Sequence, residues 1–159
     1  MTGDDVERIC ADIAAKAEGR GVRIGVAESL TGGNIAARLS RARGSGEWFS
    51  GGIVAYRPEV KYGLLEVPDG PLVCAAAAAA MARSTARLLS ADLVVAVTGE
   101  AGPDPQEDEP GTVCFALFDG GESASAEQCF SGEPGEIVAA TVQHALLMLL
   151  SRLAERSGQ

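Results

Sequence analysis

The sequence predicts an α/β protein, a three-layer α/β/α sandwich built on a mixed, mostly parallel five-stranded sheet. Apolar runs of strand length alternate with segments whose apolar residues recur every three or four positions, the spacing of one helix face. Two apolar runs, 92–98 and 112–118, follow each other with no helix between them, and "DGGE" then leads into a third run at 123–130. A turn that short joins antiparallel strands, so the sheet contains both strand directions.

In the first half of the chain, residues 4–18 carry apolar residues on one helix face. The run "VRIGVAE" at 22–28 is typical of a buried strand, and helical spacing returns at 31–42. Residues 48–56, "WFSGGIVAY", predict a second strand in which the glycine pair marks a bulge or a close backbone approach. A short helix at 58–65 begins with proline, which suits the first helical position.

In the second half, the alanine-rich stretch 73–89 has high helix propensity, and we expect its alanines to pack closely on their neighbours. Strand 92–98 is followed by an acidic loop rich in proline and glycine at 99–111. The alternating pattern of 123–130 predicts a half-exposed edge strand. A final helix at about 134–155 carries one apolar stripe. No composition shift or repeat divides the chain, so we expect a single domain over residues 1–159.

Composition narrows the possible partners. The 22 acidic residues exceed the 13 basic ones, and the formal net charge is −9. This argues against nucleic acid and against an anionic membrane as partners, and leaves a small molecule open. The first ten residues lack the basic start of a signal peptide, and no apolar run reaches the roughly 18–20 residues that span a bilayer. We therefore expect a cytoplasmic protein, with a homodimer as the first expectation for its assembly.

Metal and redox chemistry have little support in the sequence. The four cysteines are scattered, with no CxxC pair, and we expect buried, reduced thiols. The only histidine, His144, lies in the apolar pattern of the last predicted helix and is expected to pack rather than to catalyse. We therefore predict neither a metal site nor a cofactor.

Three polar clusters fall at the ends of predicted strands, where open α/β sheets bind their ligands. The first is "ESLTGG", with Glu28, Ser29, Thr31, Gly32 and Gly33. The second is Tyr56 followed by Lys61, and the third is Thr98 with Gly99. If the strands are parallel neighbours, the three clusters converge on one cleft.

The first cluster supports two interpretations. Ser29 can act as a nucleophile in acyl transfer, with the N–H groups of Gly32 and Gly33 facing a phosphate or an oxyanion. Lys61 is then the candidate base, provided that burial lowers its pKa, and Tyr56 relays or holds the proton. Alternatively, Ser29 or Thr31 only caps a helix, and the glycines allow tight packing. Spacing alone favours capping.

A family resemblance shifts this balance. The stretches "VAESLTGGNIAARL", "FSGGIVAYRPEVKYGLLEV" and "ADLVVAVTGEAGP…GTVCFAL" resemble the CinA C-terminal domain family over about residues 5–155. Active members of that family deamidate nicotinamide mononucleotide to nicotinic acid mononucleotide and ammonia, on an α/β/α sandwich and without a metal. The resemblance implies that Ser29 is the nucleophile, that Tyr56 and Lys61 assist it, and that Thr98 belongs to the site. The chain resembles the stand-alone form of the domain.

The chain also departs from the family pattern at several positions. The family's "GDR…R" segment reads "FSGEPGEIVAA" here, with Glu133 for the aspartate and Pro134 and Val138 for the two arginines. Cys74 stands where the family tends to have serine, and Glu100 replaces a usual isoleucine. The loop after "AGP" is acidic at 104–109, which is unfavourable near an anionic mononucleotide.

Two hypotheses follow from these matches and departures. The retained serine, tyrosine, lysine and threonine favour an active nicotinamide-nucleotide amidase that acts in pyridine nucleotide salvage. The lost arginines favour a degenerate family member that binds a nucleotide or a partner without turnover. Whichever holds, Glu28, Thr31, Gly32, Gly33, Thr98 and Gly99 are the expected substrate-binding residues.

Overall fold

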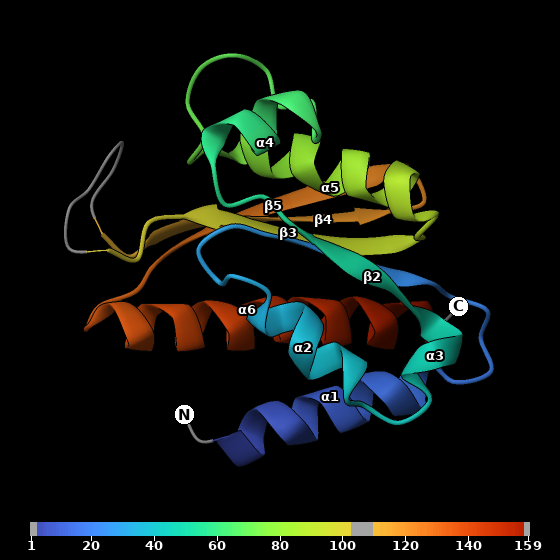
Figure 1. Cartoon of the computed structure of the whole chain (residues 1–159). Coiled ribbons are helices and arrows are strands. Elements are labelled where there is room, and N and C mark those ends of the chain that lie inside the picture. Colours follow the sequence, from blue (N-terminus) through green and yellow to red (C-terminus); the bar gives the residue numbers. More distant parts are fainter. Residues whose placement is uncertain (1–2, 103–109, 158–159) are drawn as a thin grey trace.

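A computed structural model describes residues 3–102 and 110–157 (Figure 1). Its five strands form one sheet in the order β2-β1-β3-β4-β5. The strands are β1 (Ile24–Glu28), β2 (Phe49–Val54), β3 (Leu93–Gly99), β4 (Thr112–Asp119) and β5 (Glu122–Cys129). The helices are α1 (Gly3–Ala17), α2 (Asn34–Ser40), α3 (Ser45–Trp48), α4 (Pro58–Gly63), α5 (Ala75–Leu89) and α6 (Pro134–Ser157).

The sheet is mixed, as predicted. β1 pairs in parallel with β2 and with β3, whereas β3–β4 and β4–β5 are antiparallel pairs. Four of the five strands therefore point in one direction, and only β4 is reversed. The carboxyl ends of β1, β2 and β3 consequently meet at one edge of the sheet, which is where ligands bind in this class of fold.

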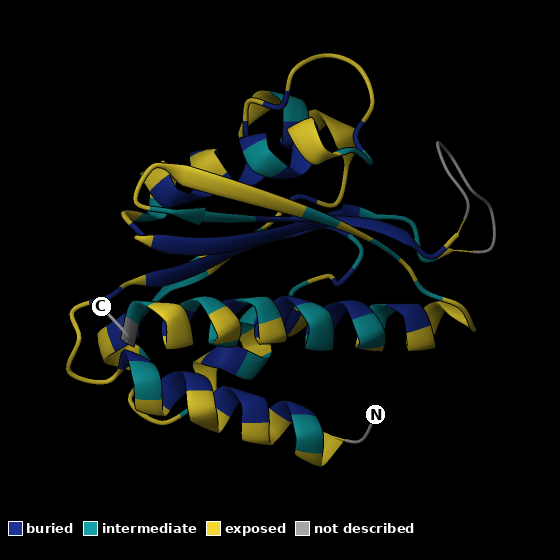
Figure 2. Cartoon of the chain, turned by 180° about the vertical axis from the view of Figure 1, so that it is seen from behind, coloured by how far each residue is buried: buried dark blue, intermediate teal, exposed yellow. Residues whose placement is uncertain are grey.

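Helices cover both faces of the sheet, which gives the three predicted layers (Figure 1). On one face, large side chains from α2 and α6 pack on the sheet, among them Leu39 and Leu149, and α1 packs in turn on α2 and α6 with residues such as Ile13. On the other face α5 contributes mostly alanines, including Ala77, Ala78 and Ala82. The alanine run is therefore a tightly packed helix face, as its sequence predicted, and the inner strands are buried between the layers (Figure 2).

The predicted glycine pair in β2 has both expected properties. The register between β1 and β2 shifts next to Gly25, and Gly51 has a positive φ of 140°. A Cβ on Gly52 would lie 2.8 Å from Val26 Cγ2 and 3.0 Å from Ala36 Cβ. Because nothing larger than hydrogen fits there, Gly52 lets α2 approach the sheet directly beneath the candidate site.

Several sequence-based expectations need correction. The helix predicted at 31–42 is shorter, α2 alone, and a turn in which Gly44 has a positive φ of 71° leads into α3, a helix that the sequence does not predict. The cysteines are all free, but only Cys10 and Cys114 are buried, and Cys129 is exposed. Within the described chain, residues Pro134–Arg156 are also long and apolar enough to cross a membrane, contrary to the sequence expectation. The core helix of a soluble domain meets the same test, and α6 buries its apolar stripe in the core.

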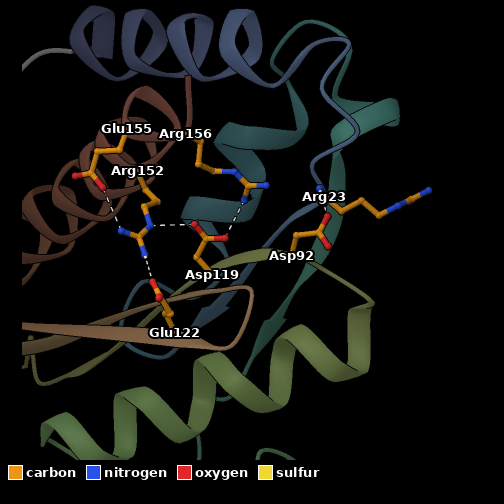
Figure 3. Close-up of polar contacts among 7 residues, drawn as sticks. All are labelled: Arg23, Asp92, Asp119, Glu122, Arg152, Glu155 and Arg156. Atoms are coloured by element: carbon orange, nitrogen blue, oxygen red, sulfur yellow. Dashed lines mark hydrogen bonds and ion pairs between the residues drawn. The ribbon is translucent and has the colours of Figure 1, made fainter. Parts of the chain in front are cut away.

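α6 is held at its far end by a carboxylate on the β4–β5 turn (Figure 3). Asp119 accepts hydrogen bonds from Arg152 Nε at 3.0 Å and from Arg156 Nη1 at 2.9 Å. Arg152 also pairs with Glu122 and Glu155. The network lies away from the carboxyl edge of the parallel strands, so it orients α6 without contributing to the candidate site.

Candidate functional site

A cavity of about 790 Å³ opens at the carboxyl edge of β1, β2 and β3. Ser29 from the end of β1, Tyr56 and Lys61 from the segment after β2, and Thr98 and Gly99 from the end of β3 all line it. The structure thus brings three separate sequence clusters into one space, as the parallel topology requires. The volume is in the range of pockets that hold small molecules.

Glu28 does not line this cavity, and its side chain is fully buried. One carboxylate oxygen, Oε1, accepts hydrogen bonds from Thr31 Oγ1 at 2.6 Å and from the backbone N–H of Ile35 at 2.9 Å. The other, Oε2, accepts from the backbone N–H of Ala36 at 2.9 Å. These N–H groups belong to the first turn of α2. Backbone N–H groups in the first turn of a helix have no hydrogen-bond acceptor within the helix itself. Glu28 is therefore the anion that caps α2, in a position that the helix dipole also favours.

The glycine turn also has a structural role. Gly33 N–H donates to Glu28 Oε1 at 3.2 Å, and Gly32 N–H donates to the carbonyl of Ser29 at 3.1 Å. Both glycines have positive φ values, 60° at Gly32 and 102° at Gly33, which residues with a side chain rarely adopt. Neither lines the cavity, and neither does Thr31. Glu28, Thr31, Gly32 and Gly33 therefore fix the turn that presents Ser29. Their contact with a substrate stays a prediction.

The alternative prediction, that Ser29 or Thr31 caps α2, is wrong because Glu28 supplies the acceptor for the first N–H groups of that helix. The N-cap position is Gly33, which has no side-chain cap of its own, and the capping acceptor comes from Glu28 inside β1. Ser29 is thus left on the cavity wall, although its side chain is only 5% exposed. A buried serine at the mouth of a parallel strand is positioned to meet a bound ligand.

Lys61 and Tyr56 occupy different environments. Lys61 is 5% exposed, and its Nζ donates to the backbone carbonyl of Tyr56 at 3.2 Å. The phenol side chain of Tyr56 is 67% exposed, although it lines the cavity. The contact between the two residues therefore runs through the tyrosine backbone, which orients the ammonium group. The exposed phenol forms part of the cavity rim.

The β3 end of the cavity is tightly built. Thr98 Oγ1 donates to the carbonyl of Leu72 at 2.8 Å, which ties β3 to the loop before α5. A Cβ on Gly99 would lie 2.6 Å from the carbonyl oxygen of Thr112, so this position accepts only glycine. Cys74 caps α5 in the same region, and its Sγ accepts from Ala77 N–H at 3.4 Å. Sulfur is a weak acceptor, so this cap is weaker than a serine cap would be.

The opposite wall comes from the start of α6. Pro134 and Val138 both line the cavity, so the two positions that depart from the resemblance face the candidate site. Neither residue carries charge. The acidic loop at 104–109, which the sequence analysis placed near the site, lies outside the described residues.

Three further polar side chains line the cavity, those of Asn34, Arg38 and Glu100, and of these only Asn34 carries no expectation from the sequence. Asn34 and Arg38 project from α2, one helical turn apart, and Glu100 follows β3. Two other arginines, Arg23 and Arg57, do not line the cavity. Arg23 is beside Asp92 at the amino end of the sheet (Figure 3), and Arg57 pairs with Glu59. Arg38 and Lys61 are the two basic residues among those lining the described cavity.

Over residues 3–102 and 110–157, no group of three or more His, Cys, Asp or Glu side chains is arranged to hold a metal ion. His144 lies away from the cavity and contacts the ring of Phe115 at a centroid distance of 4.5 Å. Burial lowers its pKa below the usual range. It is a packing residue, as its sequence context predicted.

The fold and the cavity define a class of protein, a three-layer α/β domain with a polar pocket at the carboxyl edge of a mixed sheet. The model of the CinA C-terminal domain matches residues 6–153, and the chain belongs to this family. The competence damage-inducible protein A from Klebsiella pneumoniae has the same fold, with a TM-score of 0.89 and 33% identity over 94% of this chain and 97% of that one. A competence or damage-inducible protein from Enterobacter asburiae matches with a TM-score of 0.89, 31% identity and coverage of 93% and 98%.

Longer relatives contain the same domain. The chain is 41% identical to a CinA-like protein of Geobacter sulfurreducens over 84% of this chain and 34% of that protein. It is 38% identical to a CinA-like protein of Geobacter metallireducens over 96% of this chain and 39% of that protein. The chain therefore spans well under half the length of these curated relatives.

Proposed function

We propose that the chain is a nicotinamide-nucleotide amidohydrolase that deamidates nicotinamide mononucleotide to nicotinic acid mononucleotide and ammonia. The observation that carries the proposal is the convergence of Ser29, Lys61 and Thr98 on one cavity. Membership of the CinA C-terminal domain family supports the same chemistry through the resemblance described above. In a cell this reaction belongs to pyridine nucleotide salvage, and we propose a cytoplasmic location for it.

In the proposed mechanism, Ser29 Oγ attacks the carbonyl carbon of the carboxamide. Lys61 Nζ takes the serine proton and later delivers a proton to the departing nitrogen, so that ammonia leaves and an acyl-enzyme remains. Water then attacks the acyl-enzyme, which releases the carboxylate and restores the serine. Lys61 is 5% exposed, and the hydrogen bond from its Nζ to the Tyr56 carbonyl holds the amine at the cavity.

The site offers few positive charges to bind the substrate phosphate. Among the described residues, Arg38 on α2 is the guanidinium that lines the cavity, and Pro134 and Val138, which also line it, carry no charge. Charge-assisted hydrogen bonds contribute roughly 1.5–3 kcal/mol each. A site with fewer of them binds an anionic mononucleotide less tightly, so we propose weak deamidase activity.

The uncharged residues Pro134 and Val138 on the cavity wall also support a second candidate function. A degenerate domain that binds a nucleotide or a partner without turnover would keep the fold and lose the arginines, and Glu100 adds a carboxylate to the cavity. The two proposals differ in one measurement. Purified protein incubated with nicotinamide mononucleotide releases ammonia if it is an amidase. Saturable binding without ammonia release indicates the degenerate domain.

We also propose that the chain acts as a homodimer, without a cofactor. Sedimentation velocity measured over a range of protein concentrations tests the assembly. A sedimentation coefficient that stays at the value of a 16.2 kDa monomer at all concentrations contradicts it.

A further inference from the structure

A second cavity of about 470 Å³ lies between α1 and the carboxyl-terminal end of α2. It is separate from the candidate site, with Arg38 as the only residue that lines both. Three arginines, Arg38, Arg41 and Arg43, line it from α2 and the turn that follows. Small alanines from α1 form its floor, which leaves the arginine side chains as its largest polar groups.

These three guanidinium groups differ from most others in the molecule. None of them makes an ion pair or a side-chain hydrogen bond with the residues that the structure describes. Five other arginines are paired with carboxylates, namely Arg8, Arg57, Arg87, Arg152 and Arg156. A chain with net charge −9 has ample carboxylates for such pairing, so three unpaired guanidinium groups around one cavity are unexpected.

Cys10 lines this cavity together with the charged groups. Arg38 and Arg41 both act on the buried thiol of Cys10, and their positive charges lower its pKa, although burial dominates and raises it to about 11. Two glutamates, Glu7 and Glu18, also line the cavity from the α1 side. A ligand held here must therefore lie toward α2, against the three guanidinium groups.

We propose that this cavity, the α1–α2 groove, binds a small phosphate-bearing anion through Arg38, Arg41 and Arg43. Guanidinium groups match phosphate oxygens with paired N–H donors, and several of them together discriminate against singly charged anions. The groove is of a size that holds a pyrophosphate or a phosphorylated metabolite.

The binding test uses pyrophosphate and the full chain. Isothermal titration calorimetry at constant ionic strength measures the dissociation constant for wild type and for the double variant Arg41→Gln/Arg43→Gln. A matched double variant, Arg83→Gln/Arg87→Gln, removes the same two charges from α5 on the opposite face of the sheet. We expect saturable binding that the groove variant weakens by about tenfold or more, and that the α5 variant changes by less than about twofold.

Three outcomes overturn the proposal. No saturable heat with wild type shows that the groove is not an anion site. Equal losses in both double variants show a response to net charge alone. Amide chemical-shift changes confined to Ser29, Lys61 and Thr98 place the anion in the main cavity instead. Thermal unfolding of each variant, followed by circular dichroism, ensures that only folded proteins are compared.

Because Arg38 lines both cavities, its substitution should affect ligand binding in both. Arg38→Gln is expected to weaken pyrophosphate in the groove and nicotinamide mononucleotide in the main cavity, whereas Arg41→Gln/Arg43→Gln should weaken pyrophosphate only. The mononucleotide part rests on the proposed function, and the pyrophosphate part does not, so each can fail without the other. Unchanged pyrophosphate affinity in Arg38→Gln contradicts its assignment to the groove.

Discussion

The two walls of the main cavity have diverged in opposite ways. The β1–α2 wall keeps its polar turn, held by the buried Glu28 and presenting Ser29. The α6 wall carries Pro134 and Val138 where the resemblance implies arginines. Under the proposed function, the wall that would carry out the reaction matches the family resemblance, and the wall that would hold the substrate's charge departs from it. The predictions below test each wall separately.

The largest effect is expected on the β1–α2 wall. Ser29→Ala should reduce deamidation by roughly 10³-fold or more, because the attacking oxygen is removed, and Lys61→Met should be comparably damaging since the pair acts as a unit. Ammonia release measures the loss. Ser40→Ala, an exposed serine on α2, is the matched control and should keep full activity. Near-normal turnover in Ser29→Ala would show direct attack by water in place of an acyl-enzyme.

The second prediction concerns the anchor of the same wall. Glu28→Gln keeps the size of the side chain but replaces an acceptor oxygen with an NH₂ group that faces N–H donors of α2. The free energy of unfolding should fall by about 2–3 kcal/mol, as expected when charge-assisted hydrogen bonds to a buried group are lost. Urea denaturation measures it. Glu47→Gln, on an exposed position of α3, should change stability by less than about 0.5 kcal/mol.

The third prediction tests the α6 wall. Val138→Arg should increase deamidase activity or substrate affinity by about one to two powers of ten, because it restores a charge partner for the substrate phosphate. Position 138 is preferable to 134, where replacing proline also alters the start of α6. Ala154→Arg adds the same charge at an exposed site near the far end of α6, and should have no effect on activity.

Two results would end the idea of an amidase with depleted charge. One is a Val138→Arg variant with unchanged activity and affinity. The other is a fully active wild type, which would mean that Arg38 or another group already compensates the substrate's charge.

The fourth prediction is smaller and concerns stability at acidic pH. Burial lowers the pKa of His144 in the folded chain, so between its unfolded value near 6.5 and the lower folded value the unfolded chain binds more protons. Above about pH 6.5, His144 therefore does not lower the free energy of unfolding. As the pH drops from 6.5 toward the folded pKa, the free energy of unfolding decreases. His144→Phe keeps a ring against Phe115 and should remove this contribution. Urea midpoints compared at pH 7.5 and pH 5 test it, and an identical pH dependence in both proteins would contradict it.

The smallest effect is expected at the start of α5. Cys74→Ser replaces a weak sulfur acceptor by a hydroxyl at the N-cap and should raise the free energy of unfolding by about 0.5–1 kcal/mol. Thermal unfolding measures the gain. Cys129→Ser, at an exposed position in β5, controls for the loss of a thiol. A decrease in stability on Cys74→Ser would contradict this prediction. It would show that the packing contacts of the thiol contribute more than the stronger hydrogen bond of a hydroxyl.

Periodicity predicted most of the fold because the inner strands, buried under helices on both faces, are continuous apolar runs, and because the helices carry one apolar stripe each. All five strands and the mixed sheet follow from those runs and from the short turn before β5. The failures are local. α3 is a single turn of four residues, too short to produce a periodic signal, so it was absorbed into the segments around it. The apolar content of α6 was underestimated because a few polar residues interrupt its sequence without preventing a long helix.

Sequence located the site better than it assigned the roles of its residues. Strand ends placed Ser29, Lys61 and Thr98 at one edge, because the direction of parallel strands determines where they meet. The role of Glu28 could not be predicted, since its partners Ile35 and Ala36 reach it only after α2 folds back on β1. Arg38 lies one turn after Asn34 and therefore on the same helix face, which is why both residues line the cavity.

The burial of Glu28 also affects how fast and at what cost the site can respond to a ligand. Ser29 is covalently next to a side chain that is fixed from several directions, so its backbone should fluctuate little on the nanosecond timescale, with the order parameters of a rigid core. A ligand that enters the cavity would then find the nucleophile already in place and would pay little conformational entropy to order it. Whatever slows turnover in this protein should lie in capturing the substrate, and little of it in assembling the serine turn.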